Sequence, residues 1–354
     1  MLGFEAGKRI AQAVSKADPN FSQTKYTRGL KNELEPLELK ERMIVLRDRL
    51  SLQLSPDPTA FKILLKSLSK GEADSTGLKG FHVWPLTEFV AIHGLDDYMA
   101  SLKALKEMTK VFTGEFSIRP FLLKYETEVL KILLQWSRDS NHHVRRLVSE
   151  GTRPTLPWGK KLNHFLQNPE LTWPLLNALK NDSSEYVQKS VANHLNDLSK
   201  VHGDWVVQKI QDWPNQWIVK HACRTLIKQG HRGALKINGF DTKVPELISS
   251  RLKKKKIKVG EQIEITCSLK NIHSTALNTL VDVEVHFLKK NGKHNPKVFK
   301  GRSLVLKKNE TTALNINIPL RPVTTRSYYP GIQKIRLIIN GQKSAEKKFE
   351  LECL

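Results

Sequence analysis

The sequence predicts a multi-domain protein that is α-helical first and β-stranded afterwards. The chain has 354 residues, which is enough for two domains. Near residue 240 the hydrophobic periodicity changes from the spacing of a helix to the alternation of a strand. All seven tryptophans precede that change. We therefore expect a helical domain at residues 1–240, a basic linker at 241–258 and a β domain at 259–354.

The first part carries apolar residues at helical spacing. One stripe is formed by Leu122, Tyr125, Val129 and Leu133, and another by Val187, Val191, Leu195 and Leu198. Turn-forming residues predict helix breaks at 113–115, 150–154, 168–170, 180–185 and 213–216. Short connections between helices favour antiparallel neighbours in the fold.

Four segments of the helical part repeat weakly. They are "SIRPFLLK" (117–124), "HVRRLVSE" (143–150), "YVQKSVAN" (186–193) and "WIVKHACR" (217–224). When they are aligned, their β-branched positions coincide at spacings of 26, 43 and 32 residues. Irregular repetition near forty residues favours a HEAT-like α-helical solenoid, although a plain helical bundle predicts a similar periodicity.

From Val259 onward, apolar and polar residues alternate, as in "EQIEITCSLKN" and "LVDVEVHFLK". Turn signals such as "KNGKHNP" separate these segments. The pattern predicts an immunoglobulin-like or fibronectin-like β-sandwich, without the disulfide of antibody domains because Cys267 has no partner. The run "RLKKKKIK" (251–258) is either the basic linker or a first edge strand.

Charge is the first indication of a partner. The chain contains 58 Lys and Arg against 35 Asp and Glu, a formal net charge of +23. Such a field favours polyanions, nucleic acid before an anionic membrane surface, although a basic protein without such a partner has the same composition. No apolar stretch is long enough for a membrane span, and the three cysteines form neither a zinc spacing nor a disulfide framework. We expect a cytoplasmic monomer.

Metal and cofactor chemistry find little support in the sequence. His142 and His143 are adjacent, so on a helix they cannot chelate a metal as an i, i+4 pair would. The sequence contains no P-loop, no dinucleotide-binding glycine pattern and no G-x-S-x-G motif. We therefore expect neither a metal nor a cofactor.

Two carboxylates occupy unusual positions among the basic residues. Glu150 shares a helical stripe with Arg146, and Asp197 shares another with Asn193. Both stripes lie opposite the apolar positions, so in a solenoid both acids would face one channel. An acid beside phosphates is unfavourable unless it serves a cation. The alternative is that these acids only neutralise neighbouring basic residues as helical pairs.

Trp158 presents a similar choice, because it lies in a Pro-Trp-Gly turn directly after the helix of Glu150. A tryptophan in such a turn either packs over helix ends or presents an exposed ring to a ligand. Cation–π attraction and stacking on a sugar both favour an exposed indole where positive charge must be held.

Three ordered blocks, "GEFSIRPFL", "HHVRRLVSEGTRPTLPWG" and "VANHLNDLSK", closely resemble the AlkC family of bacterial alkylpurine DNA glycosylases, in the AlkC/AlkD HEAT-like superfamily. The resemblance covers roughly residues 5–240. Some members carry a C-terminal immunoglobulin-like domain, which residues 259–354 resemble. The resemblance implies base excision repair of double-stranded DNA. The enzyme would hydrolyse the N-glycosidic bond of cationic bases such as 3-methyladenine and 3-methylcytosine, without a base-flipping pocket.

The resemblance also implies a set of site residues. Asp197 and Glu150 would stabilise an oxocarbenium-like sugar and orient water, Trp158 would contact the sugar and lesion, and Glu115 would support the geometry. The DNA contacts implied are Arg145, Arg146, Arg153, Lys160, Lys161, Asn193, Arg326 and Tyr329. Thr155 stands where many relatives have a further arginine, which leaves one phosphate contact in doubt.

Two interpretations from other classes stay open at this point. One is a non-catalytic basic HEAT-repeat scaffold that binds nucleic acid, and the other is a protein–protein solenoid with an incidental charge. A mere binder has no use for carboxylates on a phosphate-facing wall, whereas steep salt dependence of nucleic-acid binding would exclude the protein–protein solenoid.

Overall fold

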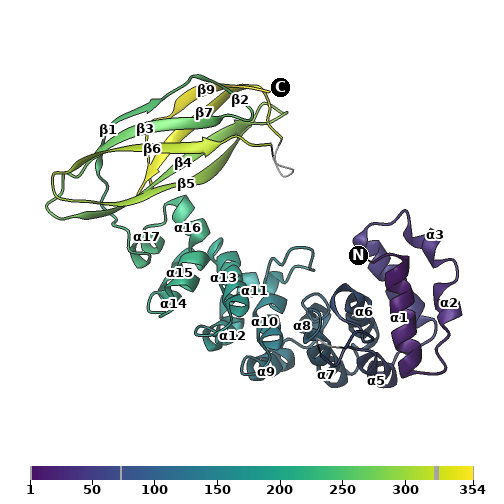
Figure 1. Cartoon of the computed structure of the whole chain (residues 1–354). Helices are drawn as coiled ribbons and strands as arrows, with labels where there is room; N and C mark the ends of the chain where they lie inside the picture. Colours follow the sequence, from purple (N-terminus) through teal and green to yellow (C-terminus); the bar gives the residue numbers. More distant parts are fainter. Residues whose placement is uncertain (1, 72–73, 323–326, 354) are drawn as a thin grey trace. The chain divides into compact units, whose positions relative to one another are not determined.

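The computed structural model describes residues 2–71, 74–322 and 327–353. The chain forms two compact units, Met1–Leu198 and Ser199–Leu354, which we describe separately (Figure 1). The first unit is helical, and the second contains four helices followed by the strands. The expected fold class, α-helical HEAT-like repeats followed by an immunoglobulin-like β domain, is confirmed.

The helices of the first unit begin and end as follows. They are α1 (Phe4–Ala17), α2 (Gln23–Thr27), α3 (Leu30–Leu34), α4 (Leu39–Ser51), α5 (Pro58–Lys66), η1 (Gly80–Val83), α6 (Trp84–His93), α7 (Tyr98–Thr109), α8 (Arg119–Lys124), α9 (Glu126–Trp136), α10 (His142–Gly151), α11 (Asn163–Gln167), η2 (Pro169–Leu171), α12 (Trp173–Ala178) and α13 (Glu185–Ser199).

Four of the helix breaks expected from the sequence lie in the first unit, and the break at 168–170 overlaps the short helix η2. The breaks expected at 113–115, 150–154, 168–170 and 180–185 separate helices as predicted. The four apolar residues expected on the second stripe are completely buried on α13. The first stripe is instead divided between α8 and α9, because Tyr125 leaves the helical conformation at φ −132° and ψ 49°. Its apolar members are nevertheless buried together, so the pattern identified the core but not the break.

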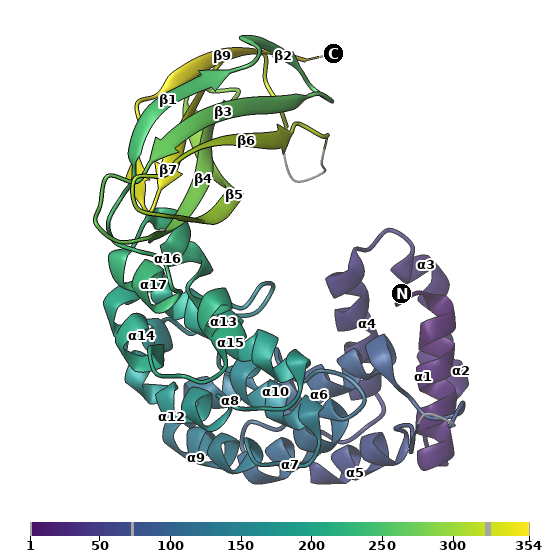
Figure 2. The ribbon, with the colours of Figure 1, turned by 60° about the vertical axis from the view of Figure 1, so that its left-hand side comes forward.

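The helices of the first unit form two rows that Figure 2 shows clearly. In that view α5, α7, α9 and α12 form an outer row, whereas α4, α6, α8, α10 and α13 form an inner row. Helix α10 contacts α7, α9 and α12, as expected when successive helical pairs stack. The N-terminus of α10 is capped by Asn141, whose side chain accepts a hydrogen bond from the backbone N–H of His143 at 2.9 Å.

The second unit begins with short helices and continues as strands. The helices are α14 (Gly203–Ile210), α15 (Gln216–Ala222), α16 (Arg224–Gln229) and α17 (Arg232–Ile237). The strands are β1 (Glu246–Leu252), β2 (Lys256–Lys258), β3 (Gln262–Lys270), β4 (Leu277–Leu288), β5 (His294–Leu306), β6 (Thr311–Pro319), β7 (Gly331–Ile339), β8 (Gln342–Lys343) and β9 (Lys347–Glu352).

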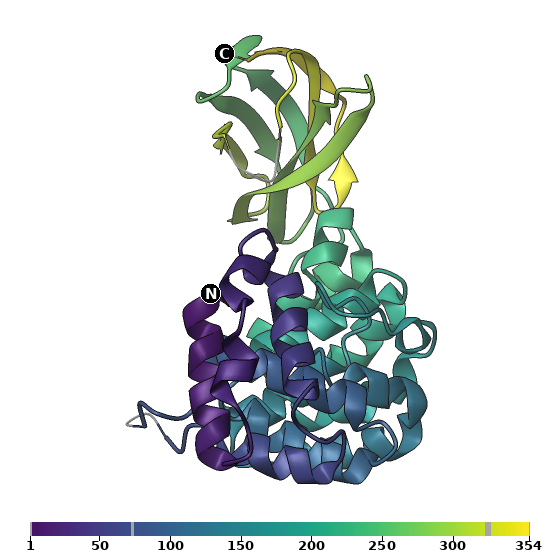
Figure 3. The same ribbon diagram turned by 90° about the vertical axis from the view of Figure 1, so that its right-hand side faces the viewer.

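The strands form two sheets that pack face to face (Figures 2 and 3). One sheet has the order β1-β3-β6, and the other has the order β2-β9-β7-β4-β5 with β8 paired to β7. A single apolar core joins them, with Ile263 and Ile265 from the first sheet and Val283, Val285 and Leu337 from the second. Alternating burial along β3 explains why its sequence pattern was recognisable.

Part of the segment expected to be a linker is strand. Residues 246–252 form β1, which pairs antiparallel with β3, and residues 256–258 form β2, which pairs parallel with β9. The edge-strand interpretation of the basic run is therefore the correct one for β2, because β2 pairs with β9 at the edge of its sheet. Within the described residues, no helix combines the length and the apolar character that crossing a membrane requires.

Candidate active site

Helices α10 and α13 bring Glu150 and Asp197 to the same guanidinium group. Arg153 donates from Nη1 to Glu150 Oε1 at 2.7 Å and from Nε to Asp197 Oδ2 at 2.9 Å. Glu150 is 5% exposed, Asp197 3% and Arg153 8%. The two acids, 47 positions apart in sequence, thus lie on either side of one nearly buried cation.

A hydroxyl chain and a histidine hold Glu150 from the side of α13. Ser149 donates to Ser190 Oγ at 2.7 Å, and Ser190 donates to Glu150 Oε2 at 2.6 Å. His194 Nδ1 lies 3.0 Å from the carbonyl oxygen of Ser149, and since a carbonyl only accepts, Nδ1 carries the proton. Burial lowers the pKa of His194 to about 4, so this ring is neutral at neutral pH. Neutral hydrogen-bonding groups therefore surround the charged cluster on that side.

Glu115 joins the cluster through Arg146. The Arg146 guanidinium is hydrogen-bonded and ion-paired to Glu115, and its Nη2 lies 3.5 Å from Glu150 Oε1. The same guanidinium lies over the ring of Tyr186, 4.9 Å from the ring centre. A pocket of about 260 Å³ adjoins this group and is lined by Arg146, Tyr186 and His143, among others. The three predicted acids are therefore connected through Arg146 and Arg153.

Trp158 is exposed rather than packed over the helix ends. Its side chain is 68% exposed, and its backbone has φ +65°, a left-handed conformation that is unfavourable for a residue other than glycine. Two long-range contacts hold this turn. Lys40 donates to the carbonyl oxygen of Trp158 at 2.7 Å, and Arg119 donates to that of Lys160 at 2.5 Å. The ring is therefore presented to the surroundings by a backbone fixed at both sides.

Arg119 and Lys40 are site residues that the sequence did not single out. Arg119 is completely buried and also donates from Nη1 to the carbonyl oxygen of Gly151 at 2.8 Å, so it joins the end of α10 to the Trp158 turn. Burial, and then the charge of Arg153, lower its pKa to about 10. Its place in the repeated segment 117–124 was the available signal, but a buried arginine is too uncommon to assign from sequence.

The acids do not line an open channel wall as we expected. Each is nearly buried, and Glu150 forms both the i, i+4 pair with Arg146 and the i, i+3 pair with Arg153. Glu150 therefore does form the local pairs with neighbouring arginines that the sequence analysis gave as the alternative. The long-range bond from Arg153 to Asp197 is not explained by helical pairing, because it joins residues 44 positions apart.

The three arginines expected to hold phosphates are instead paired within the chain. Arg145 binds Asp182 through Nε at 2.6 Å and through Nη2 at 3.0 Å. Arg146 and Arg153 are occupied by the acids described above, because buried carboxylates need a cation of opposite charge nearby. The guanidinium groups expected at phosphates are thus engaged by carboxylates of the chain itself.

The remaining predicted DNA contacts have different surroundings. Lys160 and Lys161 are exposed in the Trp158 turn, and Asn193 is half-buried on α13. Tyr329 belongs to the second unit, is half-buried, and its carbonyl oxygen accepts a hydrogen bond from Gln333 at 3.1 Å. Arg326 lies outside the described residues. The structure therefore groups Lys160 and Lys161 with Trp158.

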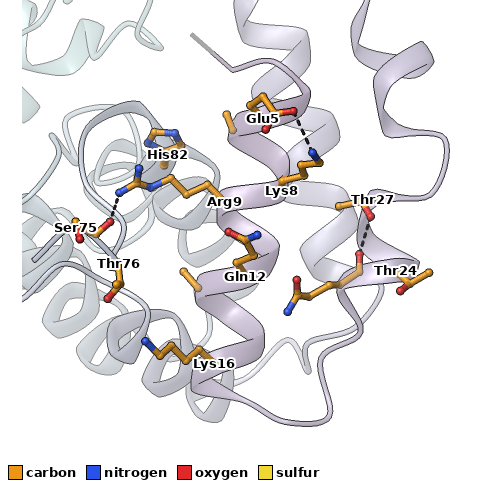
Figure 4. A pocket seen from close by; sticks show the side chains of 13 residues that line it. Glu5, Lys8, Arg9, Gln12, Lys16, Thr24, Thr27, Ser75, Thr76 and His82 are labelled. Atoms are coloured by element: carbon orange, nitrogen blue, oxygen red, sulfur yellow. Dashed lines mark hydrogen bonds and ion pairs between the residues drawn. The ribbon is translucent and has the colours of Figure 1, made fainter.

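A larger, open pocket of about 1000 Å³ lies elsewhere in the first unit, between α1, α2 and the segment before η1 (Figure 4). Lys8 pairs with Glu5 at 3.2 Å, and Arg9 donates to the carbonyl oxygen of Ser75 at 2.7 Å. None of the predicted site residues lines this pocket. The acid cluster therefore remains the candidate active site. No group of His, Cys, Asp or Glu within the described ranges has the arrangement of a metal site.

Comparison with known proteins agrees with this fold. The family model "DNA alkylation repair enzyme" matches residues 86–226, and "Uncharacterised protein YhaZ, C-terminal Ig-like domain" matches residues 246–353. The chain is 34% identical to YhaZ of Bacillus subtilis (strain 168) over 97% of this chain and 96% of that protein. It is also similar to the alkylpurine DNA glycosylase AlkC of Pseudomonas fluorescens, solved bound to DNA containing an abasic site analog. The identity is 33%, the coverage 99% of this chain and 98% of that one, and the TM-score 0.89.

Fold and site together define a HEAT-like helical repeat protein with a C-terminal immunoglobulin-like domain and a buried acid cluster. The chain belongs to the YhaZ family of AlkC-like DNA alkylation repair proteins.

Proposed function

We propose that this protein is a monofunctional DNA glycosylase that hydrolyses the N-glycosidic bond of cationic alkylated bases in double-stranded DNA. The observation that carries the proposal is the convergence of Glu150 and Asp197 on Arg153, in a chain that also exposes Trp158 and is 33% identical to AlkC. The AlkC structure contains an abasic site analog, which resembles the product of base removal. 3-Methyladenine and 3-methylcytosine are the proposed lesions.

The chemistry of these substrates suits a carboxylate cluster. When the bond between C1′ and the base nitrogen breaks, its electron pair neutralises the cationic base, so the base needs no proton to leave. The deoxyribose left behind has oxocarbenium character. Water then forms the new bond to C1′ and loses a proton, which leaves an abasic site. Negative charge near C1′ stabilises this transition state more than the ground state, and that difference is what accelerates the reaction.

In this proposal, Glu150 and Asp197 supply the negative charge and orient the water. Their low exposure favours the role electrostatically, because a charge acts more strongly where water is excluded. Trp158 offers an indole face to the developing positive charge, for which cation–π attraction is suited. Glu115 holds Arg146 in place and is a positioning residue here.

DNA binding is the second element of the proposal. Lys160 and Lys161 are exposed beside Trp158, and we assign phosphate contacts to them. Arg146 and Arg153 are ion-paired with the acids of the cluster, and Arg145 is ion-paired with Asp182. The affinity for duplex DNA should fall steeply with salt concentration, because each neutralised phosphate releases counterions.

The decisive experiment is the release of free base from methylated duplex DNA by the purified full-length chain, followed by chromatography. We expect release of the alkylated bases, and Asp197→Asn should reduce its rate by about 100- to 1000-fold. Asp182→Asn is the matched control, because Asp182 is also a buried aspartate paired with an arginine but lies outside the cluster.

The outcomes separate three interpretations. No release by the wild-type chain together with salt-dependent DNA binding would indicate the non-catalytic scaffold. Full release by Asp197→Asn would exclude Asp197 from catalysis. Equal losses in both variants would show that the effect is structural.

A further inference from the structure

The second unit contains a pocket that the proposed reaction does not use. It has a volume of about 460 Å³, within the range of small-molecule sites, and is lined by residues of α15, α16, β4 and β5 and by Phe240. Its apolar wall includes Ile227, Phe240 and Leu280. None of the acids of the candidate active site lines it.

An indole forms part of this pocket. Trp217 stacks on His221 with ring centres 4.8 Å apart and planes 9° apart, so His221 covers one face of the indole. The residue Trp217 nevertheless remains 43% exposed and lines the pocket. A large aromatic surface that is supported on one side and accessible on the other is suited to stacking with a flat ligand.

The charge of the pocket lining is predominantly positive. Lys220, Arg224, Lys228 and Lys300 line it together with a single carboxylate, that of Asp282. Asp282 accepts a hydrogen bond from the backbone N–H of Gly301 at 3.0 Å. Within the parts of the chain that the structure describes, Lys220, Lys228 and Lys300 form no ion pair. Lys228 and Lys300 interact electrostatically with Asp282, but one carboxylate cannot balance all the cations of the lining, so the pocket keeps an excess of positive charge for an anionic ligand.

Close contacts hold the helices to the sandwich beside this pocket. Gly230 ends α16 with φ +78°, and Gly341 has φ +83° between β7 and β8. Their backbones approach so closely that a Cβ on Gly230 would lie 2.7 Å from Gly341 Cα. The backbone N–H of Asp241 also donates to the carbonyl oxygen of Asn278 at 3.1 Å. The pocket is therefore built into a packed junction.

We propose that this pocket binds a nucleotide, with its base stacked on Trp217 and its phosphate held by Lys220, Lys228 and Lys300. The combination of an accessible indole, an apolar wall and an excess of cations matches the combination of a flat base and an anionic phosphate. The nucleotide comes either free in solution or as one unit of a DNA strand, and both present the same chemistry. The inference does not depend on glycosylase activity.

The test is an equilibrium titration of the full-length chain with dAMP, with a short single-stranded oligodeoxyadenylate and with inorganic phosphate. Calorimetry and tryptophan fluorescence provide the readouts. We expect Trp217→Leu to weaken nucleotide binding about 5- to 150-fold, the equivalent of the ~1–3 kcal/mol that base stacking contributes. Trp205→Leu is the matched control, because Trp205 lies on α14, outside the pocket lining.

A charge variant tests the phosphate contacts independently. Lys228→Gln combined with Lys300→Gln should weaken nucleotide binding and make it less salt-dependent. The control is Lys236→Gln combined with Lys243→Gln, two exposed lysines outside the pocket lining. Circular dichroism verifies the fold of each variant.

Each outcome is informative. Binding of dAMP that depends on Trp217 supports a free nucleotide, whereas Trp217-dependent binding of the oligonucleotide alone supports a DNA strand. The proposal is overturned if neither probe binds the wild type, if Trp217→Leu binds as tightly as Trp205→Leu, or if inorganic phosphate competes as well as dAMP. Base release is unaffected by any of these results, so the two proposals fail separately.

Discussion

Replacing Arg153 by methionine should strongly destabilise the first unit. Methionine retains an unbranched apolar chain like the aliphatic part of arginine, but the substitution removes the guanidinium cation that Glu150 and Asp197 share. Both carboxylate side chains are less than a tenth exposed, at 7% and 3%, so water cannot replace the lost partner. Breaking a buried ion pair in this way costs about 3–5 kcal/mol of unfolding free energy.

Thermal unfolding followed by circular dichroism measures this loss. The first unit spans Met1–Leu198 and is helical, so the helical signal reports on it. For a unit of this size, 1 kcal/mol corresponds to about 2–4 °C, and the midpoint should fall by about 6–20 °C. Lys110→Met is the control, because Lys110 and Glu107 are 38% and 45% exposed and their pair contributes about 0–1 kcal/mol.

A double-mutant cycle distinguishes lost pairing from lost packing. If unpaired charge causes the destabilisation, adding Asp197→Asn to Arg153→Met should restore part of the stability, with a coupling of about 0.5–3 kcal/mol. Strictly additive effects, or a loss no larger than that of Lys110→Met, would refute the electrostatic explanation of the cluster.

Three further predictions concern other parts of the chain. Burial lowers the pKa of His194 from 6.5 to about 4. The unfolding free energy is therefore highest above pH 6.5 and falls as the pH drops toward 4, because the unfolded chain takes up the proton first. Chemical unfolding should show a cost of about 2 kcal/mol at pH 5 that is absent in His194→Gln. Trp158→Gly should reduce base release while unfolding free energy stays equal or rises by about 1 kcal/mol, because glycine tolerates the left-handed backbone. Gly341→Ala should lower the unfolding free energy of the second unit by about 1–3 kcal/mol, because the new Cβ would lie 2.7 Å from Gly230 O. Gly292→Ala is the control, since Gly292 also has a positive φ but has open space around it.

The elements with strong periodicity could be predicted from sequence. The α13 stripe and the alternation along β3 report directly on burial, so their residues lie where the pattern places them. Strand β1 was missed because "ELISSRL" has no regular alternation, and its burial pattern is equally irregular. It is a strand because β3 supplies hydrogen-bonding partners, which is a tertiary effect that local sequence does not contain.

The candidate site, too, could be predicted from the sequence only in part. The spacing of Glu150 and Arg153 reveals an i, i+3 pair, but the bond from Arg153 to Asp197 depends on how α10 packs beside α13. An arginine in a basic segment was therefore expected to hold phosphate. The left-handed conformation of Trp158 could not be predicted from the sequence either, because the turn is held by Lys40 and Arg119, which are remote in sequence.

These contacts explain how a buried acid cluster and an exposed indole form one site. The acids lie on the regular helices α10 and α13, and Arg153 and Ser190 hold their carboxylates. The indole lies in a turn, and a mobile turn would dilute its contribution because stacking requires a fixed ring. Arg119 joins this turn to the end of α10, the helix that carries Glu150. Arg119 does not contact Asp197, which Arg153 holds on α13, so a change at Arg119 should alter the action of Trp158 without displacing Asp197.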